Sequence, residues 1–231
     1  MPLTTLFLDA GGVLVTPNWQ RVSAALAAHG VAVAPDSLLA ADPFARRDID
    51  LGLGQAASDE QRGWQYFNVV LEHCGVPRTE RTEAALADLR QYHQEMNLWE
   101  TVPDGVRAAL DRLREMRVKL VVVSNANGKL KVLFERLRLA NRFDVMLDSA
   151  VEGVEKPDPR LFQLALERSG SRPEDTLHVG DLYHVDVEGA RGAGLRAVLL
   201  DTANLYPNAD CPRIRSLGEL PALVERERSR G

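Results

Sequence analysis

The stretch Leu6–Gly12, which reads LFLDAGG, decides the fold of this 231-residue chain, because a short apolar run ends there at an aspartate and two glycines. Such a pattern predicts a buried strand that stops at a turn. Further apolar runs that end at or near a polar residue lie at 119–123, 143–147, 176–179 and 197–200. Each predicted strand therefore has a polar side chain at or near its carboxyl end.

Between these runs the apolar residues return at helical spacing. Val106, Leu110 and Leu113 share one helical face, and similar patterns cover residues 130–137, 158–169 and 217–224. Strands that alternate with helices predict an α/β fold, a Rossmann-like parallel sheet covered on both faces. Folds of this kind bind ligands outside the carboxyl ends of their strands, so the polar strand ends are the candidate site.

Residues 17–99 interrupt this alternation. They carry helical patterns without a convincing strand: Trp64, Phe67 and Leu71 fall on one face, and Leu86 and Leu89 on another. We therefore predict an α/β core domain made of residues 1–16 and 100–231, with a helical domain, residues 17–99, inserted into it.

Composition excludes several classes of protein. The 28 Lys and Arg residues against 33 Asp and Glu give a net charge of -5, opposite to the basic excess of a nucleic-acid-binding protein. The longest stretch without a charged residue, 22–35, is too short to cross a membrane, and the N-terminus lacks the basic region of a signal peptide. We expect a cytoplasmic protein, a monomer or a homodimer, without nucleic acid or membrane partners.

Four short motifs, taken in order, resemble the haloacid dehalogenase (HAD) superfamily. They are FLDAGGVL at 7–14, VVVSN at 121–125, KPDP at 156–159 and HVGDLYHVD at 178–186. The resemblance extends over nearly the whole chain. It implies a Rossmann-like, HAD-type core with a helical cap of the C1 type inserted between the first and second motifs, which is where the helical interval lies.

The resemblance also implies catalytic roles. Asp9 would be the nucleophile that forms a covalent aspartyl intermediate, a known role for a carboxylate. Ser124 and Asn125 stand where a strand opens toward a helix, and hydroxyl, amide and backbone N–H groups at such a place can hold phosphoryl oxygens. Lys156 would neutralise both the nucleophile and the transferred group, because a compact ammonium acts as a point charge.

The expected cofactor is Mg2+. Hard divalent cations take oxygen ligands, and the resemblance assigns these to the carboxylates of Asp9 and Asp181 and to the backbone carbonyl of Gly11. Asp186, five residues after Asp181, would assist the metal indirectly or through water; it also suits the first turn of the following helix.

One residue departs from the usual pattern of the family's phosphatases. Two positions after the nucleophile most of them carry a second Asp that acts as general acid and base, and this chain has Gly11. Such a group contributes about 10²- to 10⁴-fold in rate. The departure leaves open a phosphatase for good leaving groups, a carbon–halogen hydrolase and a weakly active binding or regulatory protein. Phosphonoacetaldehyde hydrolysis is excluded because the insert lacks the lysine that it requires.

We therefore predict a Mg2+-dependent HAD hydrolase, with a small phosphorylated metabolite as the substrate. Three residues of the insert are candidates for substrate binding: Trp19, just after the first motif, and Arg46 and Arg47, whose guanidinium groups suit an anionic substituent. Each also has a plain structural interpretation, as a core aromatic or as a solvated helix residue.

Overall fold

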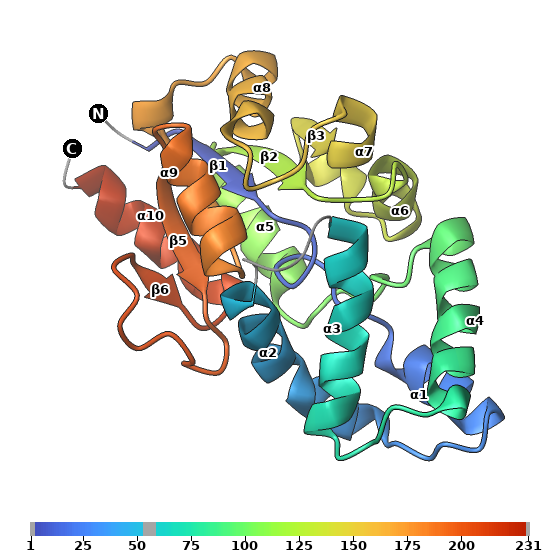
Figure 1. Ribbon diagram of the computed structural model, residues 1–231. Helices are drawn as coiled ribbons and strands as arrows, with labels where there is room; N and C mark the ends of the chain where they lie inside the picture. Colours follow the sequence, from blue (N-terminus) through green and yellow to red (C-terminus); the bar gives the residue numbers. More distant parts are fainter. Residues whose placement is uncertain (1–2, 53–58, 230–231) are drawn as a thin grey trace. The chain divides into compact units, whose positions relative to one another are not determined.

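The computed structural model describes residues 3–52 and 59–229. The chain divides into two compact units (Figure 1). The first consists of Met1–Thr16 and Val102–Gly231, and the second is the intervening segment Pro17–Thr101.

The first unit is built on a six-stranded parallel sheet in the order β3-β2-β1-β4-β5-β6. The strands are β1 (Thr5–Leu8), β2 (Lys119–Ser124), β3 (Val145–Asp148), β4 (Thr176–Gly180), β5 (Arg196–Leu200) and β6 (Arg213–Ile214). The predicted α/β fold is confirmed. The short edge strand β6 was not predicted, because two residues are too few to show an alternating or apolar pattern.

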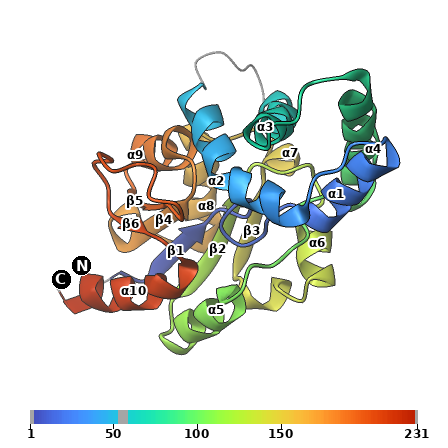
Figure 2. The ribbon, with the colours of Figure 1, turned by 90° about the horizontal axis from the view of Figure 1, so that it is seen from below.

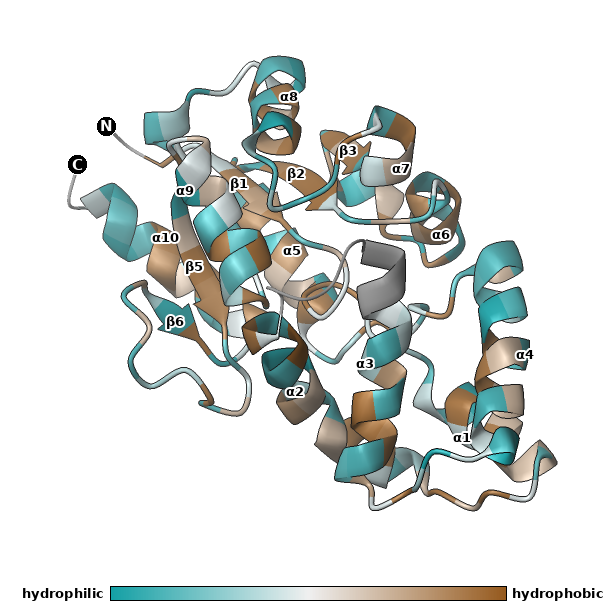
Figure 3. Cartoon of the chain, in the orientation of Figure 1, coloured by the Kyte–Doolittle hydropathy of each residue, from teal (hydrophilic) through white to brown (hydrophobic). Residues whose placement is uncertain are grey.

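Helices cover both faces of this sheet, as its largely apolar strands require. Alternate strand residues such as Phe7, Val121 and Leu199 pack with Phe162 of α8 and Ala190 of α9. Figure 2 shows α5 and α10 along the opposite face, and in Figure 3 the strands are largely hydrophobic whereas the helices carry hydrophilic residues.

The helices of the first unit follow the predicted periodicity, with shorter turns between them. They are α5 (Val106–Glu115), α6 (Leu130–Arg136), η2 (Ala140–Arg142), α7 (Ser149–Glu152), α8 (Pro159–Ser169), η3 (Pro173–Asp175), η4 (Tyr183–Glu188), α9 (Gly189–Gly192), η5 (Leu217–Glu219) and α10 (Leu220–Ser229). The η4 segment, which begins two residues after Asp181 and includes Asp186, is a π-helix, a form that often occurs at functional sites.

The second unit contains α1 (Trp19–Ala28), α2 (Pro35–Leu51), α3 (Asp59–His73) and α4 (Glu80–Met96). It has its own apolar core, in which Trp19, Tyr66 and Phe67 stack against one another. Its described residues form no strand, in keeping with the helical patterns of the sequence. Across the described parts of both units, no helix combines the length and apolar character needed to cross a membrane.

Candidate active site

The polar residues of three neighbouring strands meet at one edge of the sheet. Asp9 follows β1, Ser124 ends β2, and Asp181 follows β4. Since β1 lies between β2 and β4 and all three run parallel, their carboxyl ends lie side by side. The backbone N–H of Asp9 donates to the carbonyl of Val179 at 2.9 Å, which continues the β1–β4 pairing up to the site.

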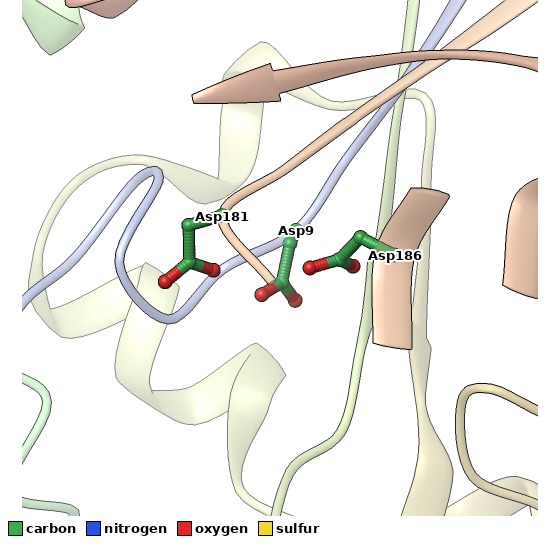
Figure 4. Close-up of side chains that lie close together, drawn as sticks. All are labelled: Asp9, Asp181 and Asp186. Carbon is green, nitrogen blue, oxygen red and sulfur yellow. The ribbon is translucent and has the colours of Figure 1, made fainter. Parts of the chain in front are cut away.

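Three carboxylates gather there. Asp9, Asp181 and Asp186 each offer an oxygen, and these oxygens lie within 4.8 Å of one another. In Figure 4 the side chain of Asp9 stands between the other two. All three residues are buried. Buried carboxylates at such a spacing repel one another unless cations compensate them.

Lys156 supplies one compensating charge. Its ammonium nitrogen Nζ lies 2.8 Å from Asp9 Oδ1 and 2.7 Å from Asp186 Oδ1, and the side chain is 1% exposed. Burial by itself lowers the pKa of Lys156, but the carboxylates of Asp186 and Asp9 outweigh burial and raise that pKa above its ordinary value. The lysine is therefore a permanent cation between two carboxylates from different elements.

Asp186 is held by donors from three directions. Its Oδ1 accepts hydrogen bonds from Lys156 Nζ and, at 2.9 Å, from His178 Nε2, and its Oδ2 accepts the backbone N–H of Leu182 at 3.1 Å. Burial favours the protonated acid, yet Lys156 and His178 together hold the pKa of Asp186 below its ordinary value. Gly180 makes room for this carboxylate, because a Cβ at position 180 would lie 2.0 Å from Asp186 Cγ.

Asp9 has the opposite electrostatic balance. Burial, together with the nearby carboxylates of Asp186 and Asp181, raises its pKa to about 7, although Lys156 opposes this rise. The site thus contains three carboxyl groups and one ammonium group, which contacts two of them. The excess of buried negative charge and the all-oxygen donor set suit a hard divalent cation such as Mg2+, so the residues present fit the expected metal.

The two residues of the second motif have different surroundings. Ser124 is buried at the end of β2, and its hydroxyl donates to the carbonyl of Asn125 at 3.2 Å. The carboxamide of Asn125 pairs with the backbone of Lys156: Nδ2 donates to the Lys156 carbonyl at 3.0 Å, and Oδ1 accepts the Lys156 N–H at 2.7 Å. Asn125 therefore ties the second motif to the third.

Sequence reasoning missed Asp148. This residue ends β3 beside Ser124, and its buried carboxylate accepts the backbone N–H groups of Gly128, Leu130 and Ala150 at 3.0 to 3.1 Å. The first turn of α6 is thus capped by a side chain from the next strand. The signal was present, since the predicted strand at 143–147 ends near an aspartate.

The loop after Asp9 folds back on itself. The N–H groups of Leu14 and Val15 both donate to the carbonyl of Ala10 at 2.9 Å. Gly12 has a φ of 74°, in the left-handed region where glycine is favoured. Gly11, by contrast, is not among the described residues with a positive φ. The position that departs from the family pattern therefore has a backbone conformation open to other residues.

The three residues predicted to bind substrate belong to the second unit. Trp19 is buried in its core, with its ring centroid 6.3 Å from that of Tyr66. The Arg46 guanidinium lies 2.9 Å from the buried carboxylate of Asp42 on the preceding turn of α2. Arg47 lies on the same helix, 3.8 Å from Asp48, and is far more exposed.

The chain was compared with known proteins. It is 30% identical over 181 residues to the haloacid dehalogenase-like hydrolase domain-containing protein 3 of Homo sapiens, covering 75% of this chain and 70% of that protein. It is 35% identical over 160 residues to the ribulose-1,5-bisphosphate 5-phosphatase of Halopiger xanaduensis, covering 68% of this chain and 64% of the relative. The matches span 55 to 64% of the length of that phosphatase and of the bovine and murine domain-containing relatives.

A solved structure agrees in fold. The crystal structure of the magnesium-bound HAD-hydrolase YfnB from Bacillus subtilis has a TM-score of 0.69 and 21% sequence identity, covering 97% of this chain and 99% of that one. The family model described as haloacid dehalogenase-like hydrolase matches residues 3–194, a span that contains all four motifs. The chain therefore belongs to the haloacid dehalogenase-like hydrolase family.

Proposed function

We propose that this protein is a Mg2+-dependent phosphatase that hydrolyses a small phosphorylated metabolite through an aspartyl-phosphate on Asp9. The observation that carries the proposal is the buried Asp9 carboxylate, 2.8 Å from the ammonium of Lys156 and clustered with Asp181. Membership of the hydrolase family and the likeness to a relative named as a phosphatase support it.

The metal would be held by Asp9, Asp181 and the backbone carbonyl of Gly11. When bound, Mg2+ would neutralise negative charge on the carboxylates and on the transferred phosphoryl group. Asp186 would support this set indirectly, since its oxygens already accept hydrogen bonds from Lys156, His178 and the backbone.

Asp9 would take part in both chemical steps. In the first, an oxygen of Asp9 would attack phosphorus while the bond from phosphorus to the leaving oxygen breaks, and the leaving oxygen keeps the electron pair. In the second, water would attack the same phosphorus and lose a proton to solvent, and the bond to Asp9 would break. Inorganic phosphate then leaves, and the carboxylate is regenerated.

Three residues would hold the phosphoryl group during these steps. The Lys156 ammonium would balance charge on its oxygens, and the hydroxyl of Ser124 and the backbone N–H of Asn125 would donate to them. The side chain of Asn125 is committed to the backbone of Lys156. Its contribution beyond that N–H would be to keep the lysine in place.

The glycine at position 11 would narrow the range of substrates. Without a carboxylate there, the leaving oxygen receives no proton from the position that most family phosphatases use. We therefore expect hydrolysis to depend steeply on leaving-group pKa, with aryl phosphates much better substrates than sugar phosphates. A flat dependence would show that another acid protonates the leaving oxygen.

Two further assignments belong to the same proposal. The helical unit would act as a cap that restricts access to the core site, and Trp19, Arg46 and Arg47 would contact the substrate. A crystal structure with a bound phosphate ester would test both assignments. The ester should be covered by the helical unit and should contact these three side chains.

The deciding experiment compares two substrates and one variant. Release of phosphate from an aryl phosphate and of chloride from 2-chloropropionate is measured with Mg2+ and with excess EDTA, with Asp9→Asn as the blank. The proposal requires phosphate release that disappears with EDTA and with Asp9→Asn, in protein shown to be folded.

The other outcomes lead to different functions. Chloride release without metal would favour a carbon–halogen hydrolase, a reaction that the glycine at position 11 does not impede because halide departs without a proton. Neither activity, in folded protein that binds Mg2+, would favour a binding or regulatory role.

A further inference from the structure

His178 is a polar residue at an apolar position. It lies in the middle of β4, is 0% exposed, and pairs in register with Phe7 of β1 and Ala197 of β5. Both neighbours belong to the apolar core between the sheet and α8. The ring of Phe162 stacks edge-on against the imidazole, with the centroids 4.9 Å apart. A buried polar ring at such a position is costly unless a hydrogen bond satisfies it.

The hydrogen bond that His178 makes leads to the candidate site. His178 Nε2 lies 2.9 Å from Asp186 Oδ1, the oxygen that also accepts the Lys156 ammonium at 2.7 Å. Burial lowers the pKa of the imidazole, which keeps the ring neutral. Because an ionised carboxylate only accepts hydrogen bonds, Nε2 carries the proton and donates it.

The geometry leaves Asp186 little freedom. Three donors hold its two oxygens, and the backbone of Gly180 passes so close that a Cβ at that position would overlap the carboxyl group. Removal of the His178 donor would leave Oδ1 with Lys156 alone. The carboxylate could then rotate, and the ammonium would move with it, away from its 2.8 Å contact with Asp9.

We propose that His178 is a positioning residue: by hydrogen bonding to Asp186 from within the apolar core, it fixes where the Lys156 ammonium lies and thereby sets the affinity of the site for phosphate. This proposal deepens the proposed function and rests on it for the phosphate ligand. The location of Lys156 can be tested without that ligand.

Two substitutions separate hydrogen bonding from packing. His178→Gln places an amide N–H near the position of Nε2, whereas His178→Leu fills the space without a donor. Thr176→Val is the matched control. It alters a fully buried residue two positions earlier on β4, on the same face of the strand, whose hydroxyl donates to the carbonyl of Arg172 at 2.8 Å, away from the carboxylates.

The first readout is phosphate affinity, measured as competitive inhibition of Mg2+-dependent aryl phosphate hydrolysis by inorganic phosphate. His178→Leu should weaken inhibition by about 10-fold or more, because the displaced Lys156 ammonium loses its charge-assisted contact with a phosphate oxygen. His178→Gln should recover most of that loss. Inorganic phosphate should inhibit Thr176→Val as strongly as it inhibits the wild type, although the thermal stability of this variant should fall.

Binding of Mg2+ shows whether a variant that loses phosphate affinity has lost only the position of Lys156 or has a generally damaged site. A metal-induced rise in melting temperature should persist in His178→Leu, because Asp9 and Asp181 remain. Unchanged inhibition by phosphate in folded His178→Leu, or a Gln variant no better than the Leu variant, would overturn the proposal.

Crystal structures of the two His178 variants give the second readout. The Leu variant should lose the 2.8 Å contact between Lys156 Nζ and Asp9 Oδ1, and the Gln variant should keep it. An unmoved Lys156 in the Leu variant would refute the positioning role even if the protein hydrolyses no phosphate ester. Absence of hydrolysis by the wild type would instead refute the proposed function alone.

Discussion

At the scale of single residues, the site concentrates unfavourable charge. The carboxylates of Asp9, Asp181 and Asp186 share one buried neighbourhood with a single lysine ammonium. Such an arrangement opposes folding in the absence of metal, since each buried carboxylate loses hydration. Stability and function therefore make opposite demands on Asp9.

This conflict gives Asp9→Asn a pH-dependent effect on stability. The pKa of Asp9 is raised from 3.8 to about 7, so its contribution to stability is present below about pH 4 and is lost as the pH rises through 7. In EDTA, the stability of Asp9→Asn relative to the wild type should therefore be about 2–3 kcal/mol greater at pH 8 than at pH 5. Chemical denaturation at the two pH values measures the difference. An equal effect at both would show that Asp9 is ionised throughout.

Gly11 gives a second prediction at this scale. Its φ is not among the positive values that disfavour side chains, whereas Gly12 has a φ of 74°. Gly11→Asp should therefore fold, and it should raise kcat on sugar phosphates by about 10²-fold or more by supplying a general acid. Gly12→Asp is the control, and it should lose stability because its side chain would have to adopt the left-handed region. A folded Gly11→Asp protein without gain would show that the loop does not direct the new carboxylate at the leaving oxygen.

At the scale of secondary-structure elements, strand ends and helix starts hold the site together across the sequence. Asp148, at the end of β3, caps the start of α6, and Asn125, directly after β2, binds the backbone that precedes α8. These contacts join elements that are 18 to 31 residues apart in the chain. The loops of the site are therefore fixed by their neighbours rather than by their own sequence.

Asp148→Ala tests this coupling. Loss of the carboxylate leaves the N–H groups of Gly128 and Leu130 without their acceptor, which should destabilise the protein by about 1–3 kcal/mol. The loop that carries Ser124 and Asn125 should loosen, so KM for an aryl phosphate should rise more than kcat falls. Asp144→Ala is the matched control, because it removes an exposed carboxylate just before β3 that also accepts a backbone N–H, that of Leu120 at 2.8 Å, away from the site. Equal effects of the two substitutions would contradict a specific role for Asp148.

At the scale of the whole molecule, the two units can be followed separately, because only one of them contains tryptophan. The three tryptophans, Trp19, Trp64 and Trp99, all belong to the unit Pro17–Thr101. The carboxylates that suit a metal belong to the other unit. Tryptophan fluorescence therefore reports on the helical unit, while far-ultraviolet circular dichroism reports on both.

Addition of Mg2+ should separate these two signals. A ligand at 100 times its Kd stabilises the unit that binds it by about 2.7 kcal/mol. Metal should thus shift the unfolding transition seen by circular dichroism to higher denaturant concentration and leave the fluorescence transition nearly in place. The shift should vanish in a protein that carries both Asp9→Asn and Asp181→Asn. Transitions that coincide and move together would mean that the two units unfold as one.

The sequence by itself determined the α/β fold, the order of its main strands and helices, and the family. These features depend on local patterns: apolar runs that end at polar residues, helical spacing between them, and motifs that are continuous in the chain. The same patterns place four site residues at strand ends or in loops near one edge of the sheet, because parallel strands end together. These residues are Asp9, Ser124, Lys156 and Asp181.

Only the tertiary structure decided which partners these residues have. Neither spacing nor composition indicated that Asn125 pairs with the backbone of Lys156, that Asp148 caps α6, or that His178 shares Asp186 with the lysine. Apart from the bond between His178 and Asp186, which are close in sequence, these contacts join segments 18 to 31 residues apart that the sheet order β3-β2-β1-β4 brings together. Local propensity cannot encode such pairs, since the free energy that selects them arises from burial and hydrogen bonding after the strands have assembled.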